Sequence, residues 1–166
     1  AKYSSGLIAT TGCPGGEIQT RLRMGAYKEA IAAASAYRDI FGRENFYLEV
    51  MDHGIEIETR VKQDLIKLGK ELGLPLLATN DLHYTKQSDA GAHEALLCVQ
   101  SGSTLADPKR FKFDNDSFYV KTAANLLSCI RNISVVKPRK NKSYLPIEND
   151  QVCVVLPVYI IFRATR

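Results

Sequence analysis

The chain has 166 residues, of which 45% are hydrophobic and 24% charged, and its formal net charge is +4. This is the make-up of one ordinary soluble domain or of part of a larger one, and no apolar run approaches the ~18 residues of a membrane span. Residues 1–124 hold 15 Lys/Arg against 16 Asp/Glu, whereas residues 125–166 hold 7 against 2. Residues 1–124 therefore carry no excess of positive charge that would indicate binding to nucleic acid.

The four cysteines, at positions 13, 98, 129 and 153, show no CxxC spacing. This pattern predicts reduced thiols in a cytoplasmic protein rather than disulfides. No charged segment followed by an apolar one opens the chain, so no signal peptide is expected. The first residue is Ala rather than Met, which is compatible with a chain that has been cut at its N-terminus.

The hydrophobic periodicity predicts strands that alternate with helices. Strands are predicted over residues 7–11, 46–51 and 76–79, and helices over residues 17–24, 27–41, 56–72 and 89–99. Gly42 and Gly73 stand where two of these helices should end. The alternation predicts an α/β fold of parallel strands joined by right-handed crossovers. Three such units are too few to close a barrel, so we expect part of a larger α/β architecture.

Beyond residue 100 the sequence patterns that predict helices and strands become weaker. Phe118–Lys121 reads as an edge or linking strand. The character of the chain changes from about residue 125, where a basic run over residues 137–142 predicts a solvated, disordered tail rather than a nucleic-acid contact. Residues 152–162 are apolar, uncharged and β-prone, which outside a folded sheet is an aggregation liability.

The most informative stretch ends the third predicted strand, where Asp81 and His83 follow an apolar run. Residues two apart on an extended strand point to the same side, with their Cβ atoms roughly 6–7 Å apart. A carboxylate and an imidazole could there converge on one metal ion or one phosphate. Active sites of parallel α/β folds are built at such strand ends, although a hydrogen-bonded Asp–His loop gives the same pattern.

Cys13 strengthens the metal interpretation, because it ends the first predicted strand. With Asp81 and His83 it would offer sulfur, oxygen and nitrogen ligands that suit zinc or a borderline transition metal. The alternative is a buried thiol beside an unrelated Asp–His loop. His53 also stands at a strand end and could face the same rim, or it could belong to an Asp-His-Gly corner that bonds its own backbone. His93, inside a predicted helix, is expected to be structural.

Several of these motifs resemble, in order, the bacterial replicative DNA polymerase III alpha subunits, and the actinobacterial form most of all. The resemblance runs from about residue 6 to about residue 124. It is carried by the segments IATTGCPGGEIQTRL (8–22), FYLEVMDHG (46–54), ATNDLHY (78–84), AHEALL (92–97), FKF (111–113) and FYVK (118–121). Residues 125–166 show no such resemblance.

The resemblance implies the PHP (polymerase and histidinol phosphatase) domain, a distorted (β/α)7 barrel. In that family a cluster of His, Asp, Glu and Cys ligands at the strand ends holds up to three metal ions, and an intact cluster supports 3′–5′ exonuclease proofreading. Cys13, Asp81 and His83 match the last three ligands of the pattern. The implied chemistry is attack on a phosphodiester by metal-activated water, with zinc, manganese or magnesium as the metal.

The departures from the family pattern limit what the chain is expected to do. The opening HxH motif and the other N-terminal ligands are absent, and nothing resembles the polymerase palm. We therefore expect the C-terminal part of a PHP barrel over residues 1–100, a bridge toward the palm over 101–124 and an unassigned tail over 125–166. Such a fragment should lack both activities and, with exposed strand edges, is expected to self-associate.

Two other interpretations stay open from the sequence. One is a stand-alone PHP-type phosphoesterase acting on a small phosphate ester. The other is a non-catalytic interaction fragment that holds no metal. DNA and the other replicase subunits are expected as partners through the full-length parent protein, a membrane is not, and no DNA-binding residue is indicated.

Overall fold

The computed structural model describes residues 2–122, 125–126, 144–146 and 152–155. Its helices are α1 (Glu17–Arg23), α2 (Tyr27–Phe41), α3 (Glu56–Leu72) and α4 (Ala90–Ser101), with short 3-10 turns η1 (Arg43–Asn45) and η2 (Gln87–Asp89). Its strands are β1 (Ala9–Thr10), β2 (Phe46–Val50), β3 (Leu76–Ala78), β4 (Tyr144–Pro146) and β5 (Val152–Val155). The predicted alternation of strands and helices is confirmed up to α4, with β1 shorter than expected.

The strands form one sheet in the order β1-β2-β3-β5-β4. The pairs β1–β2 and β2–β3 are parallel, as the alternation predicted. Strand β5 also pairs parallel with β3, and β4 runs antiparallel to β5; neither of these two pairings was predicted. Strand β5 comes from the apolar run after residue 151, and its Val152 pairs with Leu76 of β3. The rest of that run and the basic run at 137–142 lie outside the described residues.

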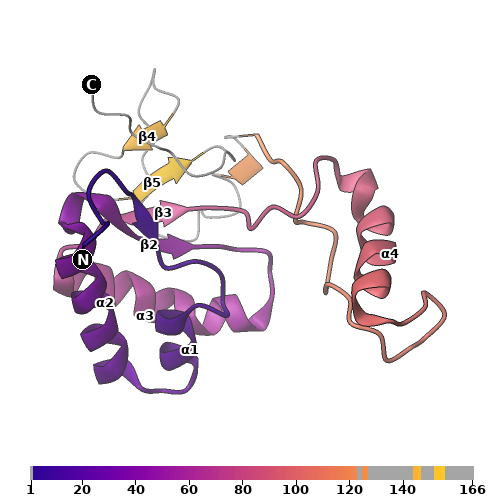
Figure 1. The fold of residues 1–166 in the computed structure, drawn as a ribbon, viewed down its shortest axis with the longest axis horizontal. Helices are drawn as coiled ribbons and strands as arrows, with labels where there is room; N and C mark the ends of the chain where they lie inside the picture. The colour runs from indigo at the N-terminus through magenta and orange to yellow at the C-terminus, as the bar shows by residue number, and fades with distance from the viewer. Residues whose placement is uncertain (1, 123–124, 127–143, 147–151, 156–166) are drawn as a thin grey trace.

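Helices α1, α2 and α3 lie together on one side of the strands, whereas α4 stands apart beyond the ends of β2 and β3 (Figure 1). This separation is reflected in burial, because Cys98 is the one buried residue of α4. By contrast α3 buries a stripe that includes Val61, Leu65 and Leu68. The carboxyl ends of the parallel strands therefore face the long connections that lead to and from α4.

The core forms where α3 packs on β2 and β3. Leu48 and Leu68 are fully buried, and each such side chain contributes about 1.5–3 kcal/mol through removal of apolar surface from water. Gly69 lets the helix approach closely, because a Cβ there would lie 3.1 Å from Leu76 Cδ2 and 3.3 Å from Leu48 Cδ1. Gly73 ends α3 in the left-handed conformation, with φ 61°, and Gly42 ends α2. Both predicted helix ends are confirmed.

One predicted strand was wrong. Over Phe118–Lys121 the structure forms an isolated parallel bridge between Tyr84 and Tyr119 rather than a strand. This segment is held to residues 80–85 by a few backbone hydrogen bonds and by the side chain of Asn80, not by a regular strand ladder. Within the described residues no helix is long and apolar enough to cross a membrane.

Leu48→Ala is expected to lower the free energy of unfolding by about 2–5 kcal/mol, because it leaves a cavity between α3 and the sheet. Urea unfolding followed by circular dichroism measures the change. Leu105→Ala is the matched control, since Leu105 is 53% exposed and its truncation should stay within about 0.5 kcal/mol. Equal losses in the two variants would contradict the core as described.

Candidate functional site

Asp81 and His83 lie just beyond the carboxyl end of β3, as predicted. Asp81 Oδ2 lies 3.6 Å from His83 Nε2, and their side chains are 32% and 35% exposed. This separation exceeds that of a normal N–H···O hydrogen bond. The two donor atoms are therefore close, accessible and not directly bonded to each other.

Asp81 has φ 40° and is the only non-glycine residue with positive φ in the part of the chain that the structure describes. This region is sparsely populated, although Asp tolerates it better than most residues. Strained backbone conformations persist where the surroundings determine them and often mark functional positions. The prediction of an extended backbone that carries both side chains was therefore wrong at Asp81, because β3 ends at Ala78 and the backbone turns at Asp81.

Cys13 is exposed, so the alternative of a buried thiol does not hold. It lies in the turn after β1, where its carbonyl accepts a 2.8 Å hydrogen bond from the Gly16 N–H. Among the described residues, no group of three His, Cys, Asp or Glu side chains is placed to hold a metal ion. The structure thus brings Asp81 and His83 together but does not complete a three-ligand group with Cys13.

The sheet order explains this gap. Strand β2 lies between β1 and β3, and two inter-strand spacings amount to about 10 Å. A single ion with ligand bonds of about 2.0–2.3 Å reaches across only part of that distance. Cys13 and the Asp81–His83 pair consequently follow two strands of the sheet, β1 and β3, that β2 separates.

His53 lies at the end of β2 but is fully buried, and both its ring nitrogens are engaged. Its Nδ1 lies 2.6 Å from Glu58 Oε1 and its Nε2 lies 3.0 Å from the Asn80 carbonyl oxygen. The His53 backbone N–H also donates to Glu58 Oε2 at 2.6 Å. Because a carbonyl oxygen can only accept, Nε2 must carry a proton. Neither nitrogen is free for a metal ion, so His53 is structural in this arrangement.

The Asp-His-Gly corner behaves as the backbone-bonding alternative predicted. Asp52 Oδ1 accepts a 3.2 Å hydrogen bond from the Gly54 N–H, which is an Asx turn. Its other oxygen, Oδ2, pairs with Lys62 Nζ at 2.6 Å, with both side chains largely buried. This ion pair ties the corner to α3 one turn beyond Glu58.

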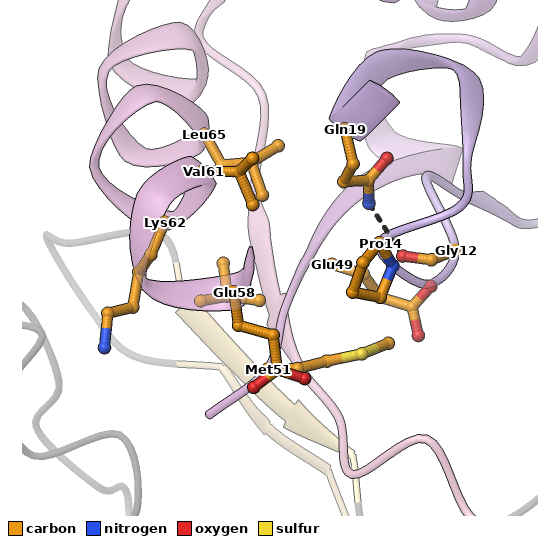
Figure 2. Close-up of a pocket in the computed structure, with 10 residues that line it drawn as sticks. Gly12, Pro14, Gln19, Glu49, Met51, Glu58, Val61, Lys62 and Leu65 are labelled. Atoms are coloured by element: carbon orange, nitrogen blue, oxygen red, sulfur yellow. Dashed lines mark hydrogen bonds between the residues drawn. The ribbon is translucent and has the colours of Figure 1, made fainter. Parts of the chain in front are cut away.

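A pocket lies nearby, at the carboxyl ends of β1 and β2 (Figure 2). Its polar walls are already occupied: Gln19 Nε2 donates to the Gly12 carbonyl oxygen at 2.7 Å, and Glu58 is bonded to His53. Neither Asp81 nor His83 lines it; the lining is Gly12, Pro14, Gln19, Glu49, Val50, Met51, Glu58, Val61, Lys62 and Leu65. This pocket therefore offers little to a ligand and is separate from the Asp81–His83 pair.

The segment after β3 is clamped to residues 115–120. Asn80 Nδ2 donates to the carbonyl oxygens of Ser117 at 2.9 Å and Tyr119 at 2.7 Å. The His83 N–H donates to the Phe118 carbonyl oxygen at 3.0 Å, and Asn115 Nδ2 donates to the His53 carbonyl oxygen at 2.9 Å. The loop that carries the predicted ligands is thus fixed on both sides.

Sequence reasoning missed this clamp. Asn80 stands directly before Asp81, and a buried Asn between an apolar strand and a predicted site is a signal that could have been used. Glu58 looked like one of several acidic residues at the start of a helix. Glu58 is bonded to His53, for which the sequence left two interpretations open, a place at the rim of the strand ends or a corner that bonds its own backbone.

Aromatic rings surround His83. They include Phe113 and Phe118, with ring centroids 4.6 and 5.9 Å away, and His93, 5.3 Å away. Burial, followed by the nearby His83, holds the pKa of His93 below its ordinary value. His93 therefore favours its neutral form beside the candidate site.

Glu58→Ala is expected to lower the free energy of unfolding by about 3–5 kcal/mol, because it leaves the buried His53 without its partner. The control is Glu56→Ala, which removes an exposed carboxylate from the same first helical turn. Its interaction with the helix dipole is worth at most about 1 kcal/mol. Urea unfolding of both variants measures the difference, and equal losses would mean that the buried pair contributes nothing.

Comparison with known proteins finds one matching family model and several similar proteins. A family model described as PHP domain matches residues 1–53. The DNA polymerase III subunit alpha of Saccharopolyspora erythraea is 60% identical over 126 residues, which is 76% of this chain and 11% of that protein. The proteins of the same name from Mycobacterium tuberculosis and Treponema pallidum are 55% and 40% identical over 126 residues, again 76% of this chain and 11% of theirs.

The chain therefore spans about a tenth of the length of these curated relatives. The identities exceed half in actinobacterial proteins. Over three quarters of its length this chain is similar to part of DNA polymerase III alpha subunits, with a PHP-domain match over residues 1–53, and the resemblance predicted from its motifs is confirmed.

Proposed function

We propose that this chain supplies part of the PHP domain of a DNA polymerase III alpha subunit, in which Asp81, His83 and Cys13 are metal ligands. The observation that carries the proposal is the 3.6 Å separation of Asp81 Oδ2 and His83 Nε2 at the carboxyl end of β3. Both side chains are open to an entering ion. The identity to alpha subunits over 76% of the chain supports the family context.

The geometry of the pair suits a shared ion. Two ligand atoms bound to one tetrahedral zinc at bond lengths near 2.1 Å lie about 3.4 Å apart. The observed 3.6 Å is close to that value and too long for a good hydrogen bond. Oxygen and nitrogen donors also accept manganese, and magnesium through oxygen, so the donor set favours zinc without excluding the others.

The described residues do not complete the site. Four-coordinate zinc needs more donors than this pair provides, and Cys13 follows β1, which β2 separates from β3. The remaining ligands would come from parts of the parent protein other than this chain. There a bound divalent metal would activate water and polarise phosphoryl oxygens, and residues of this chain would orient it.

In this proposal the parent carries out DNA-directed DNA synthesis in the cytoplasm and contacts DNA and other replicase subunits. Its PHP module would be a distorted (β/α)7 barrel with metal-dependent 3′–5′ exonuclease chemistry. Residues 1–100 would form part of that barrel, 101–124 a bridge toward the palm and 125–166 a tail. The tail's β4 and β5 extend the sheet beside β3.

A zinc titration of the purified chain by isothermal calorimetry tests the ligand assignment. Wild type should bind zinc, and His83→Gln or Asp81→Asn should weaken binding at least about tenfold, because each removes one of two chelating donors. Asn also tolerates the positive φ of position 81, so the backbone turn should be kept. Asp114→Asn, at an exposed position, is the control.

Unchanged affinity in both ligand variants would reject the assignment of Asp81 and His83. Absence of zinc binding in wild type would reject a preformed pair and favour the interpretation as an interaction fragment. Hydrolysis of a small phosphate ester by the zinc-loaded chain, lost in His83→Gln, would favour a stand-alone phosphoesterase instead.

The isolated chain is expected to perform no templated DNA synthesis, because none of its sequence resembles a polymerase palm. Primer extension with a labelled primer–template and all four deoxynucleotides measures this. Extension above a no-protein blank, retained after further purification, would contradict the proposal that the activity belongs to the parent.

A further inference from the structure

We infer that Phe118, together with Phe113, positions the imidazole of His83, so that the segment around residues 113–120 is a working part of the candidate site. This inference rests on the proposed role of His83 as a metal ligand. It assigns a positioning role to residues that come some thirty positions after the ligand in the chain.

The first step is the backbone. The Phe118 carbonyl oxygen accepts hydrogen bonds from the N–H groups of His83 at 3.0 Å and Tyr84 at 3.4 Å. Two residues on, the Val120 N–H donates to the Thr85 carbonyl oxygen at 3.2 Å. The main chain that carries His83 is therefore fixed to the main chain of Phe118.

The second step is the rings. Phe113 meets the His83 ring edge-on, at 4.6 Å and 85°, and Phe118 does so at 5.9 Å and 79°. Phe113 and Phe118 also contact each other, at 4.5 Å. Edge-to-face contacts of this kind contribute about 0.5–1.5 kcal/mol each beyond their buried area. Together they limit the rotation of the imidazole.

The third step is the support behind Phe118. Its ring stacks on His53 at 4.2 Å and 15°, and Phe118 is only 7% exposed. His53 is itself held by Glu58 and by the Asn80 carbonyl oxygen. The position of the His83 ring is thus set, through Phe118, by a buried hydrogen-bonded pair that includes the first turn of α3.

A histidine that binds a metal ion needs its ring held in a fixed orientation. Metal-bound imidazoles are normally oriented by a hydrogen bond from the second ring nitrogen. The contacts of the His83 ring include the Asp81 carboxylate and the rings of Phe113, Phe118 and His93. Ring packing therefore contributes to the orientation that such a ligand needs.

The chain has three histidines, so a spectrum of the ¹³C-labelled imidazoles resolves each one. Phe118→Leu is expected to shift the signals of His53 and His83, and Phe113→Leu those of His83 and His93, because the ring currents change. Phe111→Leu is the matched control, since Phe111 is 64% exposed and its ring contact is with Phe113. His83→Gln assigns the signal.

Zinc affinity provides the second readout. Phe118→Leu and Phe113→Leu should weaken binding about tenfold, the lower end of the effect of removing a residue that orients a ligand. Phe111→Leu should leave the affinity unchanged. Phe113→Tyr keeps the ring at a half-buried position and should restore both the signal position of His83 and the affinity.

The outcomes separate the two proposals. If wild type binds no zinc, the metal assignment fails, while the imidazole spectra still decide whether the phenylalanines fix His83. If the His83 signal and the zinc affinity stay at wild-type values in Phe113→Leu and Phe118→Leu, the inference is overturned. Should Phe118→Leu fail to fold, the half-buried Phe113 variants decide alone.

Discussion

The buried pair of His53 and Glu58 is the interaction on which the candidate site depends. It joins the end of β2 to the first turn of α3, and through the Asn80 carbonyl oxygen it reaches the end of β3. Asn115 donates to the His53 carbonyl oxygen from 62 residues away. Four separate stretches of chain therefore meet at His53, through its imidazole and its backbone, and the loop with Asp81 and His83 begins at the next residue after Asn80.

A buried polar cluster of this kind destabilises the fold unless every donor and acceptor in it has a hydrogen-bond partner. Here the ring nitrogens, the backbone N–H and the carbonyl oxygen of His53 each have a partner. An apolar substitute could fill the same volume, but it would specify no direction for the strand ends. The network instead fixes both the register and the direction of the loops that leave β2 and β3. The stacking of Phe118 on His53 then extends that order to the accessible site.

Local pattern was enough to predict α1, α2 and α3, because their apolar periodicity and the glycines that end them lie within a few residues of each other. It also placed Asp81 and His83 on one loop with their side chains close. It could not show that His53 is buried, since an Asp-His-Gly corner looks solvent-exposed until distant residues such as Asn115 and Phe118 cover it. Likewise the place of β5 beside β3 is a pairing between residues about 75 positions apart, which no local periodicity encodes.

The same difference between local and long-range determinants explains why the structure brings Asp81 and His83 together but does not group Cys13 with them. The pair is made by two residues of one turn, so its 3.6 Å geometry is set within a single loop and is held by the Asn80 clamp. Cys13 follows a strand of two residues, and its position relative to β3 depends on the intervening β2. Strand β2 adds about 5 Å on each side. Asp52 and His53, which follow β2, are bonded to Lys62 and Glu58. Among the described residues, no three His, Cys, Asp or Glu side chains form a group that could hold a metal ion. The geometry that one loop determines is therefore present in this chain, whereas a grouping that would need three strands is not.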